Sequence, residues 1–244
     1  MNTAARATPL HFYTTPPHGC SYLPARQATT LFADPGMPKN DTVYALLSNH
    51  GFRRSGEHLY RPHCHACRAC VAVRLAVQEF APKRHQRRAW ELNADLDIRV
   101  IPPDYHPEHF DLYRRYLAGR HAGGGMDDPT PQQYLEFLTS SWTATLFYEM
   151  YLDGRLVAVA VVDQLADALS AVYTFYDPEL RDRSLGKFAI LYEIDTARAQ
   201  GLRWLYLGYW IAACRKMSYK VDFQPLEYFW EGRWSRRAPV LPPA

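Results

Sequence analysis

Residues 63–70 read His-Cys-His-Ala-Cys-Arg-Ala-Cys, in which three cysteines recur at every third position with two histidines among them. Thiolate and imidazole groups at such spacing are typical zinc ligands, and a Cys-x-x-Cys pair can also carry redox chemistry. The other two cysteines of the chain are Cys20 and Cys214. The stretch is open to three interpretations: a metal site, a redox pair, or a loop whose thiols only pack.

The cellular compartment helps to choose among these interpretations. Residues 1–19 contain no basic segment followed by an apolar one, and no apolar run approaches the roughly 20 residues that span a bilayer. We therefore expect a cytoplasmic protein with no membrane partner, in which a tight group of reduced cysteines binds metal or does chemistry. The absence of a thioredoxin-like pattern around the cysteines disfavours the redox interpretation.

Basic residues are concentrated in one part of the chain. The net charge is only +3, but residues 53–88 contain nine Lys or Arg against two Glu, which gives +7 for this stretch and −4 for the remainder. A local excess of this kind favours a polyanionic partner such as RNA or DNA. The alternative is a basic surface that contacts only solvent.

A second segment that could bind a substrate covers residues 181–188, Arg-Asp-Arg-Ser-Leu-Gly-Lys-Phe. It lies between an expected strand and an expected helix, where backbone N–H groups and the helix N-terminus attract phosphate. It matches neither a Walker A loop nor a dinucleotide-binding fingerprint. The chain also lacks the HExxH and Gly-x-Ser-x-Gly motifs, so an enzyme of this sequence is expected to position two reactants rather than to form a covalent intermediate.

The elements that would hold these segments follow from periodicity. An alternating apolar pattern over 144–176, with the turn Asp153-Gly154, predicts a three-stranded antiparallel meander. Periodicity and end signals predict a short helix over 40–51 and a strand over 97–101, and after residue 102 three further helices and one further strand. The helices are expected over 107–119, 131–142 and 187–200, and the strand over 203–211.

The N-terminal part is expected to form a unit of its own. Residues 52–75 predict a hairpin with the cysteine stretch at its bend and 71–75 as its returning strand, followed by a basic connector over 83–96. We predict an α+β fold, with a small cysteine-bearing N-terminal domain over 1–80 and a second domain over 81–244. The order of meander, loop, helix and strand in the second domain resembles that of acyltransferases of the acetyltransferase superfamily.

Six segments together resemble the aminoacyl-tRNA protein transferases. They are CSYLP at 20–24, FRRSG at 52–56, YRPHCHACRACVAVRL at 60–75, SAVYTFYDP at 170–178, RSLGKF at 183–188 and YLGYWIAACRKMSYK at 206–220. The resemblance runs from about Pro17 to Trp230. It implies an acetyltransferase-like (GNAT-type) catalytic domain. It also implies transfer of an amino acid, leucine in bacterial members, from its tRNA to the N-terminal Asp or Glu of a protein, which marks that protein for degradation by the N-end rule.

The resemblance also implies roles for individual residues. Tyr173, Tyr176 and Tyr209 would line the aminoacyl pocket, and Asp177 would hold or deprotonate the attacking amine. The terminal adenosine of the tRNA would contact Arg183, Ser184, Gly186 and Lys187. The acidic side chain of the acceptor would meet a cation drawn from Arg74, Arg120, His121, Lys216 and Lys220. Residues 53–88 would bind the acceptor arm of leucyl-tRNA, and catalysis would need no cofactor.

A structural metal is a further implication. Eukaryotic relatives have a Cys-Gly-Tyr-Cys motif and a later Cys-Cys pair that are implicated in binding zinc or an iron–sulfur cluster. Here Cys20 matches the first cysteine, Leu23 stands in place of the second, and Cys64, Cys67 and Cys70 replace the later pair. Four thiolates would suffice for a tetrahedral site, while the altered ligands leave open whether zinc, an iron–sulfur cluster or no metal is bound.

Other functions remain open at this point. Transfer of arginine instead of leucine depends on the shape of the pocket. An acetyl-CoA-dependent N-acetyltransferase fits the order of elements, but 181–188 lacks the fuller glycine-rich pattern of those enzymes. A non-catalytic RNA-binding zinc protein fits the cysteines and the charge, but leaves the segments 170–178 and 206–211 without a purpose.

Overall fold

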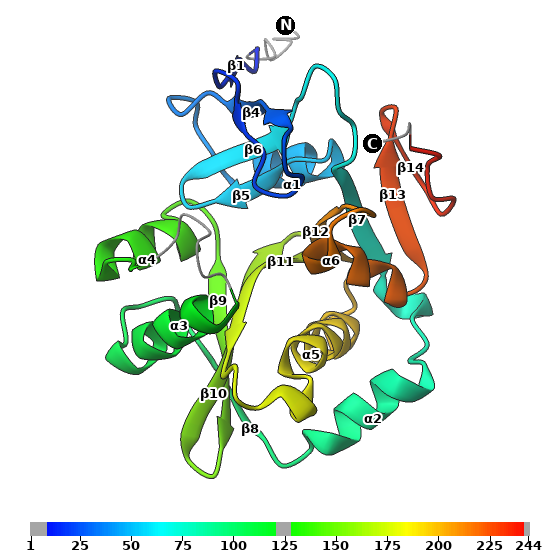
Figure 1. Cartoon of the computed structure of the whole chain (residues 1–244). Helices are drawn as coiled ribbons and strands as arrows, with labels where there is room; N and C mark the ends of the chain where they lie inside the picture. The colour runs from blue at the N-terminus through cyan, green and yellow to red at the C-terminus, as the bar shows by residue number, and fades with distance from the viewer. Residues whose placement is uncertain (1–8, 121–127, 242–244) are drawn as a thin grey trace, which may run out of the picture.

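A computed structural model describes residues 9–120 and 128–241. Its framework is an eight-stranded mixed sheet in the order β14-β13-β7-β12-β11-β10-β9-β8, with helices on both faces (Figure 1). Of the neighbouring strand pairs described in this sheet, β11 and β12 run parallel and all the others run antiparallel. The strands are β7 (Val71–Ala76), β8 (Asp97–Ile101), β9 (Thr145–Leu152), β10 (Arg155–Leu165), β11 (Ala168–Tyr176), β12 (Trp204–Trp210), β13 (Leu226–Trp230) and β14 (Arg233–Ser235). The mixed α and β content is as predicted.

A smaller sheet from the N-terminal residues covers one end of the large one (Figure 1). Its strands lie in the order β1-β4-β6-β5, all antiparallel, and the short pair β2–β3 and helix α1 accompany it. The bounds are β1 (Phe12–Thr14), β2 (His18–Gly19), β3 (Gln27–Ala28), β4 (Thr30–Ala33), α1 (Asp41–Asn49), β5 (Arg53–Ser55) and β6 (His58–Pro62). Helix α1 begins where Asn40 accepts a hydrogen bond from the N–H of Val43 at 2.9 Å, a typical N-cap.

The hairpin expected over residues 52–75 is wrong in its second half. β6 pairs with β5 and β4, whereas β7 crosses into the large sheet and pairs with β12 and β13. All six residues of β7 are buried, as expected for a central strand covered on both faces. The predicted boundary at residue 80 assigns β7 to the N-terminal domain, although the strands that pair with β7 lie within residues 204–228. The division into two domains stays a prediction.

The second half of the chain follows the predicted order. The meander forms as β9, β10 and β11, helix α5 (Leu185–Ala199) crosses the sheet, and β12 returns beside β11. Helices α3 (Pro107–Arg120) and α4 (Pro131–Leu138) confirm the two earlier helices. The expected connector over 83–96 is instead largely a helix, α2 (Arg84–Leu92), in which Gln86 and Lys83 form a capping box.

Helices cover both faces of the large sheet (Figure 1). On one face α5 packs its apolar side on β9, β10 and β7, and on the other α3 and α4 pack on β9, β10 and β11. The N-terminal unit contributes a third apolar cluster with Leu165, Ala168 and Tyr206 at the neighbouring part of the second face. Within residues 9–120 and 128–241, no helix combines the length and the apolar character that a bilayer-spanning segment needs.

The parallel strands β11 and β12 separate after a short contact. They pair only over Ala168–Ser170 and Trp204–Tyr206, although β11 continues to Tyr176 and β12 to Trp210. Residues 171–174 of β11 are all partly exposed although β11 is an inner strand. On β12 two residues, Leu207 and Gly208, lie opposite one residue of β7, which is a β-bulge.

A buried ion pair connects the N-terminal unit to the large sheet. Arg54 on β5 donates from Nε and Nη2 to the two carboxylate oxygens of Asp163 on β10, at 2.6 and 2.7 Å, and both side chains are fully buried. Tyr44 and Thr145 donate to the same carboxylate at 2.8 and 2.7 Å. Arg54 also donates to the carbonyls of Leu138, Thr139 and Gly56. The remaining hydrogen-bonding capacity of both ions is thus largely used, which is what a buried pair requires.

Replacing Arg54 by Met should destabilise the protein strongly, because the carboxylate of Asp163 would stay buried without its counter-ion. We expect the free energy of unfolding to fall by about 3–5 kcal/mol, as for other broken buried pairs. Urea unfolding followed by circular dichroism measures this change.

The control for this substitution is Arg236→Met. It breaks the exposed pair of Arg236 with Glu79, where each side chain is 54% accessible. Exposed pairs contribute about 0–1 kcal/mol, so its effect should be small. Equal effects of the two substitutions would show that the buried pair does not hold the two parts of the fold together.

Candidate functional site

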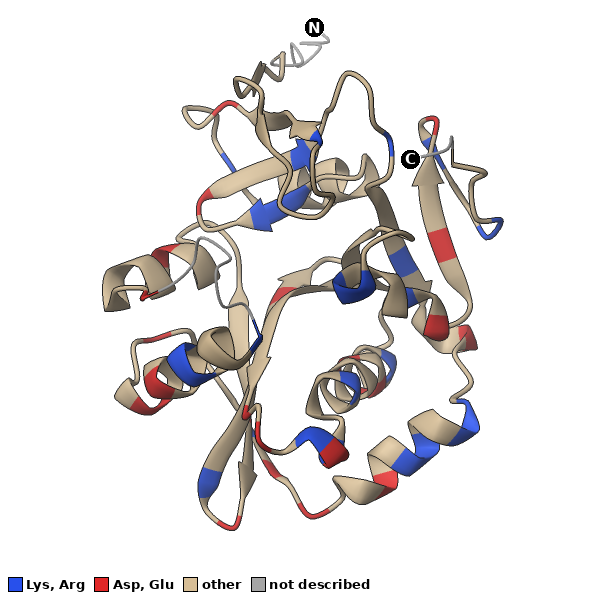
Figure 2. Cartoon of the chain, viewed as in Figure 1, with Lys and Arg blue, Asp and Glu red and all other residues tan. Residues whose placement is uncertain are grey.

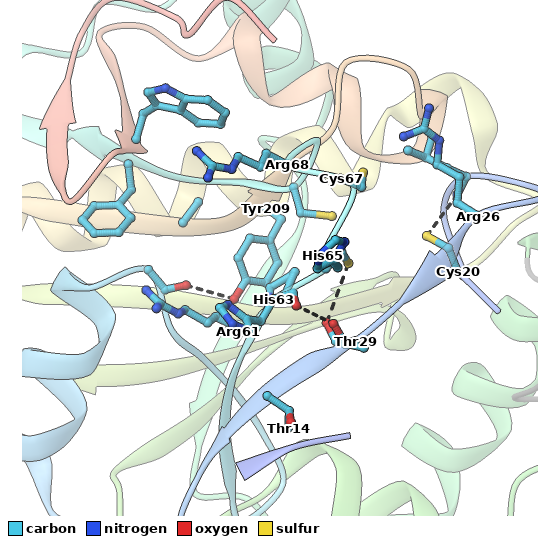
Figure 3. Close-up of a pocket in the computed structure, with 18 of the residues that line it drawn as sticks. Thr14, Cys20, Arg26, Thr29, Arg61, His63, His65, Cys67, Arg68 and Tyr209 are labelled. Atoms are coloured by element: carbon cyan, nitrogen blue, oxygen red, sulfur yellow. Dashed lines mark hydrogen bonds between the residues drawn. The ribbon is translucent and has the colours of Figure 1, made fainter. Parts of the chain in front are cut away.

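A cavity of ≈ 710 Å³ lies between the N-terminal unit and the end of β12 and β13. Figure 3 shows its lining, which includes Arg26, Arg61, Arg68, His63 and His65. Glu231 is the one acidic residue among the residues that line it, so the cavity is strongly basic. All four cysteines of the predicted metal site also line it: Cys20, Cys64, Cys67 and Cys70.

The cysteines suit a metal by their chemistry but are not gathered around one point. Thiolates bind zinc or iron, and four of them satisfy a tetrahedral ion. In the part of the chain that the structure describes, however, no three Cys, His, Asp or Glu side chains come close enough together to hold an ion. Cys64 donates to the carbonyl of Thr29 at 3.7 Å, and Cys20 accepts from the N–H of Leu23 at 3.4 Å.

Tyr209 forms part of the wall between this cavity and the large sheet (Figure 3). Its hydroxyl donates to the carbonyls of Gly51 and Tyr60, at 2.9 and 3.1 Å, and burial raises the pKa of the hydroxyl well above its usual value. Tyr209 therefore stays neutral and anchors the N-terminal unit to β12. Its predicted place in the aminoacyl pocket is untested.

A second group of tyrosines lies where β11 leaves β12. Tyr173 packs its ring on Phe137 and Tyr116, and Tyr176 packs on Tyr116 with ring centroids 5.0 Å apart. Arg120, at the end of α3, donates to the hydroxyl of Tyr176 at 3.0 Å. The structure thus brings Tyr173, Tyr176 and Arg120 together, as an aromatic wall with a cation at its rim.

The loop and first turn of α5 lie next to this wall. A Cβ on Gly186 would come within 3.0 Å of Tyr176 Cε1, so the glycine lets the helix approach the ring closely. Ser184 is the N-cap residue in a left-handed conformation, with φ 54°, and its side chain makes no capping hydrogen bond. Lys187 is partly exposed in the same turn.

Arg183, the fourth residue predicted to hold the adenosine, has a structural partner instead. It binds both carboxylate oxygens of Asp95 at 2.7 and 2.8 Å and donates to the carbonyl of Leu92. Its hydrogen bond to Asp95 raises the pKa of Arg183 and lowers that of Asp95. Arg183 therefore ties the loop before α5 to the α2–β8 connection, which leaves fewer of its donors for a phosphate than we expected.

Asp177 is poorly placed for its predicted role as a base. Its buried carboxylate accepts from Arg115 and Arg155 at 3.0 and 2.9 Å and from the N–H of Glu179. Burial alone would raise the pKa of Asp177, but the Glu179 N–H and the two guanidinium groups outweigh it and the pKa is lowered. A carboxylate held this way fixes the end of β11 and is a weak proton acceptor.

The cations proposed for the acceptor's acidic side chain lie in different environments. Arg74 is occupied: it pairs with Glu227 at 2.8 Å and lies between the rings of Trp204 and Trp234. Lys220 is buried and donates to the carbonyl of Tyr209 at 2.5 Å. Lys216 is exposed on the short helix α6 (Arg215–Ser218), and His121 lies outside the described residues.

The basic stretch 53–88 is divided by the fold. Arg53, Arg54 and Arg74 are buried, so they add nothing to a surface. Arg61 and Arg68 line the cavity that also holds the four cysteines, which we call the cysteine cavity. The remaining four basic residues are exposed on or next to α2 (Figure 2). Those four are Lys83, Arg84, Arg87 and Arg88.

Two buried ionisable groups were missed by sequence reasoning. Arg53 is adjacent to Arg54, and the sequence does not say which of the two takes a carboxylate. Glu193 on α5 is fully buried, and neither of its carboxylate oxygens has a partner among the described residues. A signal for Glu193 was present, because it follows Leu185 and Ala189 at intervals of four on the apolar face of the helix.

Comparison with known protein families shows the family to which this chain belongs. A family model for the N-terminus of arginine-tRNA-protein transferases matches residues 18–88, and the model for the C-terminus of the same proteins matches residues 108–230. The chain belongs to the arginine-tRNA-protein transferase family. It is therefore an enzyme, as the resemblance of the six segments predicted.

Curated relatives of this transferase carry a more specific name. A protein of Pseudomonas fluorescens (strain Pf0-1) called aspartate/glutamate leucyltransferase is 53% identical over 225 residues, which cover 92% of this chain and 96% of that protein. One of the same name from Pseudomonas aeruginosa (strain LESB58) is 52% identical with the same coverage.

Solved structures show only a distant likeness to the transferase. A crystal structure of FemX matches with a TM-score of 0.44 and 10% identity, over 82% of this chain and 79% of that one. The structure of L-PGS from Bacillus licheniformis matches with a TM-score of 0.45 and 12% identity, over 69% of this chain and 50% of that one.

Glu193 makes the stability of the transferase depend on pH. Burial raises the pKa of Glu193 from 4.5 to about 8, so the folded protein keeps a proton that the unfolded chain loses. Stability should therefore fall as the pH rises from 4.5 to 8. Glu193→Gln removes this loss, and above pH 8 the variant should be more stable than the wild type by up to about 5 kcal/mol.

Urea unfolding near pH 4 and near pH 8.5 measures the difference between the two proteins. Near pH 4 the two should unfold with nearly the same free energy, because Glu193 is protonated in both states. Glu91→Gln, on the exposed side of α2, is the control and should change neither value. A wild type that is as stable as the Gln variant at both pH values would show that Glu193 is not buried as a neutral acid.

Proposed function

We propose that this transferase moves leucine from leucyl-tRNA to the N-terminal Asp or Glu of acceptor proteins and thereby marks them for N-end rule degradation in the cytoplasm. The observation that carries the proposal is the identity of about one half, over nearly the whole chain, to relatives named aspartate/glutamate leucyltransferase. The exposed basic side chains would bind the tRNA. The tyrosines near the point where β11 and β12 separate would bind the aminoacyl group.

The reaction is the aminolysis of an ester. The α-amine of the acceptor attacks the carbonyl carbon that joins leucine to the terminal ribose. A C–N bond forms, the C–O bond breaks, and the proton of the amine ends on the ribose hydroxyl that leaves. An α-amine has a pKa of about 7.7–8.0, so part of it is already neutral near pH 7 and orientation supplies most of the remaining need. The lowered pKa of Asp177 is consistent with a reaction that does not rely on this carboxylate as a base.

The fold offers a place for this orientation. We propose an acetyltransferase-like catalytic domain, in which the meander β9–β11, helix α5 and the parallel strand β12 form the acyl-transfer unit. Its strands separate after Ser170 and Tyr206, and Tyr173 and Tyr176 lie on the part of β11 beyond this point. The leucyl group would lie on these rings, and the terminal adenosine near Ser184, Gly186 and Lys187 at the start of α5.

The exposed cations would hold the acceptor arm of the tRNA. Lys83, Arg84, Arg87 and Arg88 on and beside α2 have solvent-exposed side chains, and Arg26, Arg61 and Arg68 line the basic cavity. Phosphate contacts of this kind are independent of sequence and release counterions. Binding of leucyl-tRNA should therefore weaken as salt is added.

The four cysteines that line the cavity would hold a structural zinc ion or iron–sulfur cluster. Three of them lie in 63–70, a segment without regular secondary structure that can move toward Cys20 more easily than a strand or helix. Such a group would fix the segment against the N-terminal unit. It would supply no step of the transfer reaction.

The transfer reaction tests the main proposal directly. Labelled leucine and, separately, labelled arginine are offered on charged tRNA with peptides that begin with Asp, Glu, Lys or Ala. We expect leucine to appear on the Asp and Glu peptides only, because the relatives that support the proposal are named for these two acceptor residues. Arginine transfer to the same peptides would change the donor in the proposal.

Two further results of this assay would overturn the proposal. One is the absence of transfer from either tRNA by protein that unfolds cooperatively in urea. The other is labelling of the peptides from acetyl-CoA, which would favour an N-acetyltransferase. A control with uncharged tRNA and free labelled leucine excludes label that reaches the peptide without passing through the ester.

Metal analysis tests the role of the cysteines. We expect protein purified without oxygen to contain about one zinc ion or one iron–sulfur cluster per chain, and Cys67→Ser to lose most of it because four thiolates are needed for a closed site. Cys214→Ser is the matched control, since Cys214 does not line the cavity, and it should keep the metal. Wild-type protein that stays metal-free after incubation with zinc or with iron and sulfide would contradict the proposal.

A further inference from the structure

Arg53 is a buried cation without a counter-ion. Only 5% of its surface is accessible, and no acidic side chain among the described residues pairs with it. Its Nη2 donates to the carbonyl of Val73 at 3.0 Å and reaches that of Gly208 at 3.5 Å, while Nε and Nη1 have no partner in the described chain. The guanidinium also lies over the ring of Tyr206, 4.8 Å from the centroid. Two of its nitrogens are thus buried without an acceptor.

A second buried basic side chain, Lys220 of the 3-10 turn Tyr219–Asp222, reaches the same bulge of β12. Lys220 is 5% accessible, and its ammonium donates to the carbonyl of Tyr209 and contacts Met217 Sδ at 3.8 Å, with no carboxylate among its described contacts. Burial, and next the charge of Arg53, lowers the pKa of Lys220 to about 7. The two cations are therefore close enough to repel one another in a place that holds no negative charge of its own.

This arrangement is an exception within the molecule. The other buried arginines have carboxylate partners: Arg54 binds Asp163 and Arg74 binds Glu227. A buried charge without a partner costs several kcal/mol, so its presence points to an anion that arrives from outside. Both side chains approach Gly208, whose carbonyl is 3.5 Å from Arg53 Nη2, and this residue is partly exposed, so the bulge reaches the surface next to them.

We infer that Arg53 and Lys220 form the pocket for the side-chain carboxylate of the acceptor's N-terminal Asp or Glu. The inference rests on the proposed function and adds to it the residues that select the acceptor. Both side chains approach Gly208, in the segment of β12 that no longer pairs with β11. A carboxylate bound there would place the α-amine of the same residue toward the ester.

The depth of the two cations favours a carboxylate over a phosphodiester. An RNA backbone presents a large, continuous surface, and the cations suited to it are the exposed ones on α2 and in the cysteine cavity. Arg53 and Lys220 are each only 5% accessible, so a terminal group on a short side chain suits them better than a backbone phosphate does. A carboxylate oxygen can accept a charge-assisted hydrogen bond from Nε or Nη1 of Arg53, both of which lack a partner among the described residues.

Arg53→Met tests the inference in the transfer assay. The substitution keeps a long side chain and removes the unpaired charge, so folding should be kept. We expect kcat/KM for the Asp peptide to fall by about 30-fold or more, as when one member of a buried charge pair is lost. The KM for leucyl-tRNA and the low transfer to an Asn peptide should stay unchanged. Lys220→Met, with a similar selective loss, is the second variant in case the first does not fold.

Two variants serve as controls. Arg203→Met removes an exposed guanidinium just before β12 and should behave like the wild type. Arg53→Lys keeps a charge but loses the planar guanidinium and its hydrogen bond to the carbonyl of Val73, so it should recover only part of the activity on the Asp peptide.

The outcomes separate this inference from the function on which it rests. A wild type that transfers leucine to Asp peptides, together with folded Arg53→Met and Lys220→Met variants that transfer equally well, would overturn the carboxylate pocket alone. Equal losses on Asp and Asn peptides would also overturn the carboxylate pocket and would assign the two side chains to the ester. A raised KM for leucyl-tRNA with acceptor use unchanged would overturn it too and would assign them to a phosphate. A wild type that transfers nothing overturns the function, and the pocket with it.

Discussion

The structure depends on one buried ion pair, between Arg54 of the N-terminal unit and Asp163 of the large sheet. Successive side chains of a strand point to opposite faces, so the direction of Arg54 also sets the direction of Arg53. With Arg54 held by Asp163, Arg53 is directed toward β7 and the bulge of β12. The same pair therefore joins two parts of the chain and aims a cation that has no structural partner.

The basic residues divide into three groups by what surrounds them. Some are buried with carboxylates and hold elements together, as Arg54 and Arg74 do. Others are exposed, as on α2, where their charge acts at long range on a polyanion. Arg53 and Lys220 are buried without a carboxylate, and within the described chain only this group combines restricted access with the lack of a counter-ion. A sequence-level count of +7 over residues 53–88 hides this division, which burial alone reveals.

Much of the second half of the fold could be predicted from the sequence, because the turn Asp153-Gly154 and the helical spacing in α3 and α5 are local signals. The pairing of β7 with β12 and β13 could not, since a buried strand of apolar residues gives no sign of its distant partners. Helix α2 was missed because its four charged residues conceal a narrow buried face of Gln86 and Ala89. Within the candidate site, residue types such as the tyrosines were predictable, whereas the partners of Asp177, Arg74 and Arg183 depend on tertiary contacts between distant segments.

The position of β7 has a consequence for how the protein is made. This strand leaves the ribosome early, yet both neighbours with which it pairs, β12 and β13, are synthesised only near the end of the chain. Translation at about 5–20 residues per second leaves its apolar face waiting for seconds. During that interval β7 is an unpaired strand that other nascent chains or a chaperone can contact, so the pairing that joins distant parts of the finished chain in one sheet also leaves this strand exposed during synthesis.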